Sequence, residues 1–144
     1  MNTTAIIPIK YNSSRIPGKN FKLMNGKPLF YYIINTLLKC KNVKHIIINL
    51  DNNHIKTQIN KYFDTDKINY YRRPQYLFGD DVSTNYLIKD TLLNVDVNTD
   101  VCLQTHVTNP LLSPQTILNA IDKYSKIKNK IRKQDKSVDL NKDE

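Results

Sequence analysis

Short apolar runs alternate along the chain with segments whose apolar residues recur every three or four positions. Short runs rich in Ile, Val and Leu that end at polar turn residues are typical of strands, and the longer periodic segments are typical of helices. The predicted strands are Ala5–Ile9, Val43–Leu50, Lys67–Arg72 and Asp100–Gln104. The predicted helices are Pro28–Lys41, His54–Phe63, a segment capped by Ser83 or Thr84 that ends near Asn94, and a segment from Pro114 onward. This alternation predicts an α/β fold with a mostly parallel sheet and helices on both faces.

Three polar segments follow predicted strands: Lys10–Asn20, Asp51–Asn53 and Thr105–Ser113. Ligands bind at the carboxyl ends of the strands in open parallel sheets. The first segment contains Pro17 and Gly18, which turn the chain sharply. Between Lys10 and Lys27 the chain has five cations and no carboxylate. These segments are therefore the candidates for a ligand site.

The loop Lys10–Asn20 can hold phosphate groups through its backbone amides, with Lys10, Arg15 and Lys19 compensating the negative charge. Its glycine spacing matches neither the Walker P-loop nor the dinucleotide-binding fingerprint. Composition alone leaves a second interpretation open, a solvated basic loop with surface lysines.

The formal net charge of the chain is +9, which raises nucleic acid as a partner. About a third of this excess lies in residues 126–144, and most of the rest lies between Lys10 and Lys27. No basic helix face or nucleic-acid motif accompanies it, so a local phosphate site is preferred and no nucleic-acid partner is expected. Residues 1–125 are interpreted as one nucleotide-binding part, and 126–144 as a polar basic tail that is disordered at its end.

No apolar run approaches the length of a membrane span, and the N-terminus lacks the apolar core of a signal peptide. The two cysteines, Cys40 and Cys102, make no disulfide or metal framework, and we expect both to be buried, reduced and inert. A cytoplasmic protein without a membrane partner is the expectation.

Three segments together resemble the sugar-acid cytidylyltransferases, which are the acylneuraminate (CMP-sialic acid) synthetases and the related CMP-KDO synthetases. The first is Ile-Pro-Ile-Lys-x-Asn-Ser-Ser-Arg-Ile-Pro-Gly-Lys-Asn, which ends at Asn20. The second is Arg73-Pro74 followed by Gly79-Asp80-Asp81-Val82-Ser83-Thr84, and the third is Leu103-Gln104-Thr105 followed by Asn109-Pro110-Leu111-Leu112. Their order and spacing match the family from residue 4 to about residue 125.

The resemblance implies a Rossmann-like fold of the nucleotide-diphospho-sugar transferase kind, and an enzyme that transfers CMP from CTP to a sialic acid-like or KDO-like sugar acid, releases pyrophosphate and uses Mg²⁺. By their positions in the matching motifs, Lys10, Arg15 and Lys19 are expected to hold the triphosphate and act in catalysis. Ser13, Asn20, Arg73, Ser83 and Gln104 are expected to bind the nucleotide. No metal ligand is assigned, since family members carry those aspartates in a later segment that the chain does not show.

The chain departs from the family pattern at several positions. Lys10 stands where the family usually has Arg, and His106 replaces a small hydroxyl residue; we interpret His106 as a neutral structural imidazole. Asp80 and Asp81 are interpreted as acids at the start of a helix rather than as a metal pair. The segment that binds the sugar acid and forms the family's homodimer is not recognisable. The alternative to an active enzyme is therefore a truncated, inactive nucleotide-binding remnant.

Overall fold

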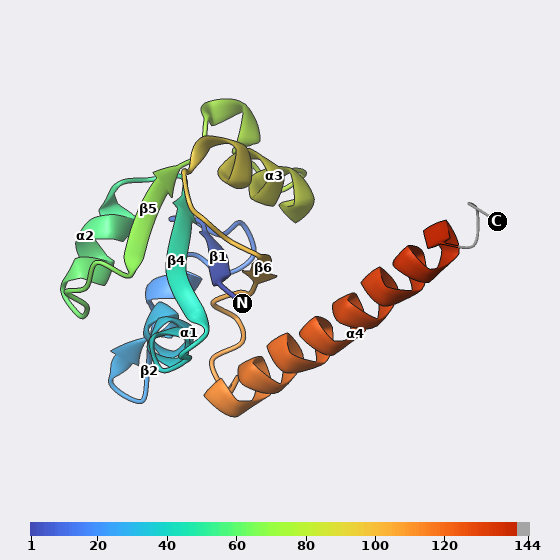
Figure 1. The fold of residues 1–144 in the computed structure, drawn as a ribbon. Helices are drawn as coiled ribbons and strands as arrows, with labels where there is room; N and C mark the ends of the chain where they lie inside the picture. Colours follow the sequence, from blue (N-terminus) through green and yellow to red (C-terminus); the bar gives the residue numbers. More distant parts are fainter. Residues whose placement is uncertain (141–144) are drawn as a thin grey trace.

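Four parallel strands form the centre of the protein, as a computed structural model shows (Figure 1). The structure describes the backbone of residues 1–140 and the side chains through residue 133. The strands are β1 (Thr3–Ile9), β4 (Val43–Leu50), β5 (Ile68–Arg72) and β6 (Val101–Gln104), in the order β5-β4-β1-β6. The central pair, β1 and β4, is covered on both faces, which explains why both read as nearly continuous apolar runs.

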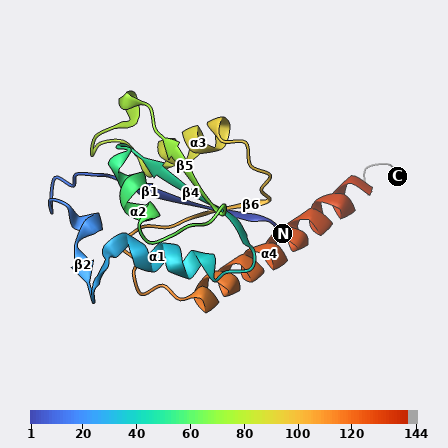
Figure 2. The same cartoon turned by 90° about the vertical axis from the view of Figure 1, so that its left-hand side faces the viewer.

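Helices cover both faces of the sheet unequally, and the predicted arrangement is confirmed. The apolar side chains of α1 (Leu29–Leu38), α2 (His54–Asn60) and the start of α4 (Pro114–Leu140) share one core with alternate residues of β1 and β4. The opposite face carries α3 (Thr84–Asn94). Figure 2 shows α3 on one side of the sheet, with α1 and α4 on the other.

Between β1 and α1 the chain forms a 3-10 turn, η1 (Lys19–Phe21), and a two-stranded hairpin of β2 (Leu23–Met24) and β3 (Lys27–Pro28). Asn25 and Gly26 both have positive φ, 50° and 81°, as a tight type I′ hairpin turn requires. Pro28 precedes the first residue of α1 in an extended conformation. A second 3-10 turn, η2 (Gln75–Leu77), follows β5.

The last helix, α4, continues across residue 125 to Leu140 and extends away from the sheet (Figure 1). The polar composition of residues 126–140 predicted a tail, but Lys, Arg and Gln are good helix formers. The prediction of disorder falls partly on residues 141–144, which lie outside the described residues. None of the helices within 1–140 is both long enough and apolar enough to cross a membrane.

The two cysteines are free thiols in different environments. Cys40 is buried as expected, whereas Cys102 on the edge strand β6 is only half-buried. Burial, complete for Cys40 and partial for Cys102, raises the pKa of both thiols, which favours the unreactive protonated form.

Candidate nucleotide-binding site

The loop after β1 is held by hydrogen bonds at its start and between its ends. The Tyr11 amide donates to Asp51 Oδ1 at 2.9 Å, which ties the loop to the end of β4. The Asn20 side-chain amide donates to the Lys10 carbonyl at 3.0 Å and so joins the two ends of the loop. Gly18 has a φ of 63°, a left-handed conformation that suits glycine, and η1 begins at the next residue. The cations of this loop therefore project from a fixed backbone.

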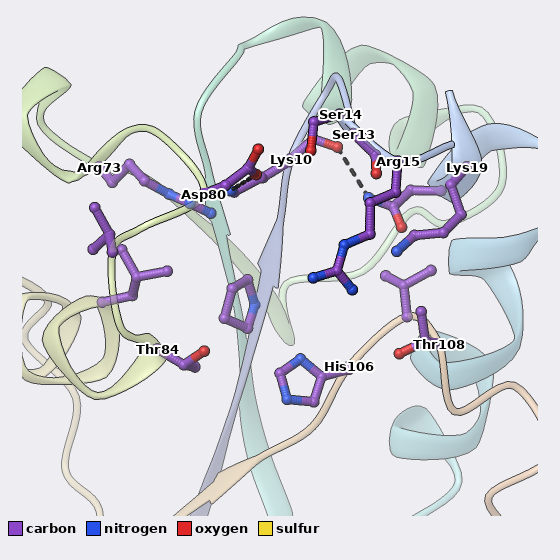
Figure 3. Close-up of a pocket in the computed structure, with 15 residues that line it drawn as sticks. Lys10, Ser13, Ser14, Arg15, Lys19, Arg73, Asp80, Thr84, His106 and Thr108 are labelled. Atoms are coloured by element: carbon purple, nitrogen blue, oxygen red, sulfur yellow. Dashed lines mark hydrogen bonds and ion pairs between the residues drawn. The ribbon is translucent and has the colours of Figure 1, made fainter. Parts of the chain in front are cut away.

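A pocket of about 440 Å³ lies where this loop meets the segments that follow β5 and β6. Figure 3 shows Arg15 and Lys19 on one side of the pocket and Arg73 and Asp80 on the other. Lys10 is the fourth cation of the lining, and Asp80 is its only carboxylate. Such an excess of positive charge in a cleft attracts a polyanion. The pocket volume is within the range of small-molecule sites.

Six of the eight residues expected from the sequence line this pocket, and two do not. The six are Lys10, Ser13, Arg15, Lys19, Asn20 and Arg73. Ser83 instead caps α3, where its Oγ accepts a hydrogen bond from the Asn85 amide at 3.4 Å, and its neighbour Thr84 lines the pocket. Gln104 lies just behind the lining, with its Nε2 at 2.6 Å from His106 Nε2.

Asp80 forms an ion pair in the pocket lining that the sequence did not reveal. Lys10 Nζ donates to Asp80 Oδ1 at 2.6 Å and to the Gly79 carbonyl at 2.5 Å. Hydrogen bonds from Lys10 and Ser14, together with the charges of Lys10 and Arg15, lower the pKa of the Asp80 carboxyl. Asp80 is therefore more than an acid near the start of a helix, as the sequence had suggested. Its carboxylate pairs with Lys10, a side chain expected to hold phosphate.

Arg73 follows β5 and is 2% exposed, which is exceptional for an arginine. Its Nε donates to Asn49 Oδ1 at 2.6 Å, and its Nη2 donates to the carbonyls of Asn49 at 2.8 Å and Ile9 at 3.4 Å. Burial lowers the pKa of Arg73, and the Asp51 carboxylate counteracts that shift. Arginine stays protonated at neutral pH, so the pocket holds a desolvated, fixed cation.

Sequence reasoning also missed the lining residues on the other loops. His106 was interpreted as a structural imidazole, but it is exposed and lines the pocket with Thr84 and Thr108 (Figure 3). Its position two residues after the end of a predicted strand was the available signal. The polar segment Asp51–Asn53 is absent from the lining, and its Asp51 fixes the first loop instead.

The donors in this pocket do not make a Mg²⁺ site. Mg²⁺ prefers several oxygen ligands, usually including a carboxylate. Asp80 is paired with Lys10, and three further cations line the same pocket. No cluster of three or more His, Cys, Asp or Glu side chains occurs within the described part of the chain.

Comparisons with known proteins identify related enzymes. The chain is 36% identical over 62 residues to 3-deoxy-manno-octulosonate cytidylyltransferase 2 of Hydrogenovibrio crunogenus, an alignment that covers 43% of the chain and 25% of the relative. It is 28% identical over 130 residues to CMP-N,N'-diacetyllegionaminic acid synthase of Legionella pneumophila, which covers 85% of the chain and 53% of the relative. The chain thus spans about half the length of the latter enzyme.

A solved structure of CMP:2-keto-3-deoxy-manno-octonic acid synthetase complexed with CTP has the same fold. The TM-score is 0.69 at 18% sequence identity, and the match covers 88% of the chain and 48% of that structure. The family model described as Cytidylyltransferase matches residues 4–143, nearly the whole chain. The protein therefore belongs to the cytidylyltransferase family.

Proposed function

We propose that the protein is the nucleotide-binding part of an enzyme that transfers CMP from CTP to a sugar acid and releases pyrophosphate. The observation that carries this proposal is the pocket with Lys10, Arg15, Lys19 and Arg73 at the carboxyl ends of parallel strands. The relatives named for octulosonate and legionaminic acid chemistry support a sugar acid as the acceptor.

The cations of the pocket suit a displacement at phosphorus. When a sugar-acid hydroxyl attacks the α-phosphorus of CTP, negative charge grows on the phosphate oxygens and on the leaving pyrophosphate. Lys19 is a mobile point charge that can follow the phosphates, and Arg15 offers a planar fork for an oxygen pair. Lys10, which is paired with Asp80, adds a further positive charge beside them. Their contribution is electrostatic stabilisation of that charge. The residues that line the described pocket do not fit Mg²⁺. We expect the ligands of this ion to lie outside this part of the chain.

The alternative is a nucleotide-binding remnant without activity. The chain spans about half the length of the legionaminic acid relative and of the matched structure. In that case the pocket still binds CTP. A homodimer and a cytoplasmic location stay predictions under either alternative.

One experiment separates the alternatives. CTP, Mg²⁺ and a panel of octulosonic, legionaminic and sialic acids are incubated with the protein, and pyrophosphate release is followed. CTP binding is measured in parallel for Lys19→Ala, with Lys22→Ala as the matched control because Lys22 is exposed and outside the pocket lining. Release of pyrophosphate supports the enzyme, whereas CTP binding that is lost only in Lys19→Ala, without release, supports the remnant. No CTP binding by the wild type would contradict both.

A further inference from the structure

An ordered chain of buried hydrogen bonds lies beneath the pocket, between β4 and α3. Asn49 and Thr91 are both 0% exposed, and each is polar in an otherwise apolar environment. Asn49 Oδ1 accepts from Arg73 Nε at 2.6 Å, and Asn49 Nδ2 donates to Thr91 Oγ1 at 2.7 Å. The Thr91 hydroxyl donates in turn to the Leu87 carbonyl at 2.7 Å. Buried polar groups are costly unless they are paired, and here each has a partner.

The direction of each of these hydrogen bonds follows from which groups can donate and which can accept. Arg73 Nε can only donate, so Asn49 must present its carbonyl oxygen to it. The Asn49 amide nitrogen then faces Thr91, whose oxygen accepts while its hydrogen is used on Leu87. The amide orientation is thus fixed by its partners at both ends.

The same bonds leave one part of Arg73 available to a ligand. Nε and Nη2 are used on protein acceptors. Nη1 has no protein acceptor within the described residues and is not completely buried. Since Arg73 lines the pocket, two N–H donors of a fixed guanidinium are available there.

We propose that Asn49, held by Thr91, is a positioning residue that orients Arg73 so that Nη1 donates to a carbonyl or phosphate acceptor of the bound nucleotide. This inference rests on the proposed CTP binding. A rigid donor binds better than a mobile one because less conformational entropy is lost on binding. Without the Asn49 side chain the plane of the guanidinium is no longer fixed, and Nη1 no longer points toward the nucleotide acceptor.

The test measures CTP binding by calorimetry and thermal unfolding for a set of variants of the full chain. Asn49→Leu is expected to weaken CTP binding about tenfold or more. Asn49→Asp keeps the acceptor for Nε and should stay within about threefold of the wild type. Ile47→Val is the matched control, because Ile47 is buried on the same face of β4 two positions away and should lower stability with unchanged CTP affinity.

A double variant separates positioning from stability. Asn49→Leu removes the side-chain acceptor of the buried Arg73 Nε and leaves that donor unpaired. Adding Arg73→Met removes the buried charge with a side chain of similar length. We expect the double variant to be more stable than Asn49→Leu, yet to bind CTP no better, since the donor is gone. Arg73→Met alone should bind as weakly as the double variant.

Two different failures are distinguishable. If the wild type does not bind CTP, the proposed function fails and this inference with it. If the wild type binds CTP and Asn49→Leu, folded, binds as tightly as Ile47→Val, the inference alone is overturned. If Asn49→Leu does not fold, Thr91→Val decides: a two- to threefold loss of CTP affinity supports positioning, and an unchanged affinity overturns it.

Discussion

Replacing Asp80 by asparagine should strengthen nucleotide binding. The Asp80 carboxylate accepts a hydrogen bond from Lys10 at 2.6 Å, and its pKa is lowered by Lys10 and Ser14. These are groups of the loop that is proposed to hold the triphosphate. If the loop holds the triphosphate as proposed, the carboxylate competes with the phosphates for Lys10, and it places a negative charge in the pocket. The substitution Asp80→Asn would keep the shape of the side chain and remove both effects.

The expected gain is modest because the ion pair is open to solvent. The side chains of Lys10 and Asp80 are 29% and 59% exposed. Exposed pairs are weak and screened, so freeing Lys10 should tighten CTP binding about two- to fivefold at low salt. The gain should shrink at about 0.5 M salt, because the screening length then falls to a few ångströms.

Calorimetric titration of CTP at low and high salt measures this effect, with Asp81→Asn as the matched control. Asp81 lies in the same loop, but it is exposed and outside the pocket lining. Its substitution by asparagine changes the net charge by the same amount as Asp80→Asn. Equal gains in both variants would mean that net charge alone explains the effect. Weaker CTP binding in Asp80→Asn would refute the competitor role and would indicate that Asp80 itself contacts the nucleotide or an ion bound to it.

Three further changes have defined outcomes. Ser83→Ala should lower the free energy of unfolding by about 0.5–1 kcal/mol, because α3 loses its cap, and should leave CTP affinity unchanged. Thr84→Val should weaken CTP binding, because Thr84 lines the pocket. Urea denaturation measures the stability of both variants, and calorimetry measures their CTP affinity. Phe30→Ala should destabilise the fold by about 3–5 kcal/mol, measured by urea denaturation, because Phe30 is 1% exposed in the main core. Tyr70 and Tyr71, whose pKa values burial raises to about 12, should ionise near pH 12 in a spectrophotometric titration. Because the unfolded chain releases these protons near pH 10, stability should fall as the pH rises from 10 to 12.

The central strands could be predicted because both of their faces are buried. Val43–Leu50 is a strand with the predicted bounds, and β1 begins only two residues before the predicted start. The hairpin around Asn25 was missed although Asn-Gly is a strong turn signal, because its two-residue strands are too short to show alternation. The length of α4 could not be predicted from its polar sequence, because a helix that extends beyond the core has no apolar face to bury and so shows no apolar periodicity.

The cationic loop was predictable because its charges lie close together in the sequence. The partners of that loop were not, because they depend on which loops meet in space: Asp80 is 70 positions from Lys10. The difference between Ser83 and Thr84 is a matter of one position at a helix start, where one side chain caps and the next faces the pocket. Asn49 gave no signal, because a single polar residue in an apolar run reveals neither its burial nor its partner.

The charges of the pocket also limit what it can recognise. A triphosphate brings several negative charges, and Lys10, Arg15 and Lys19 are the cations of the loop available to compensate them. Arg73, the fourth cation, has its Nε and Nη2 donors committed to Asn49 and Ile9, which leaves only Nη1. Within the described pocket no cation is then left for the carboxylate of a sugar acid. We therefore expect CTP affinity to be independent of added sugar acid, because the carboxylate of the second substrate must be recognised by residues outside this pocket.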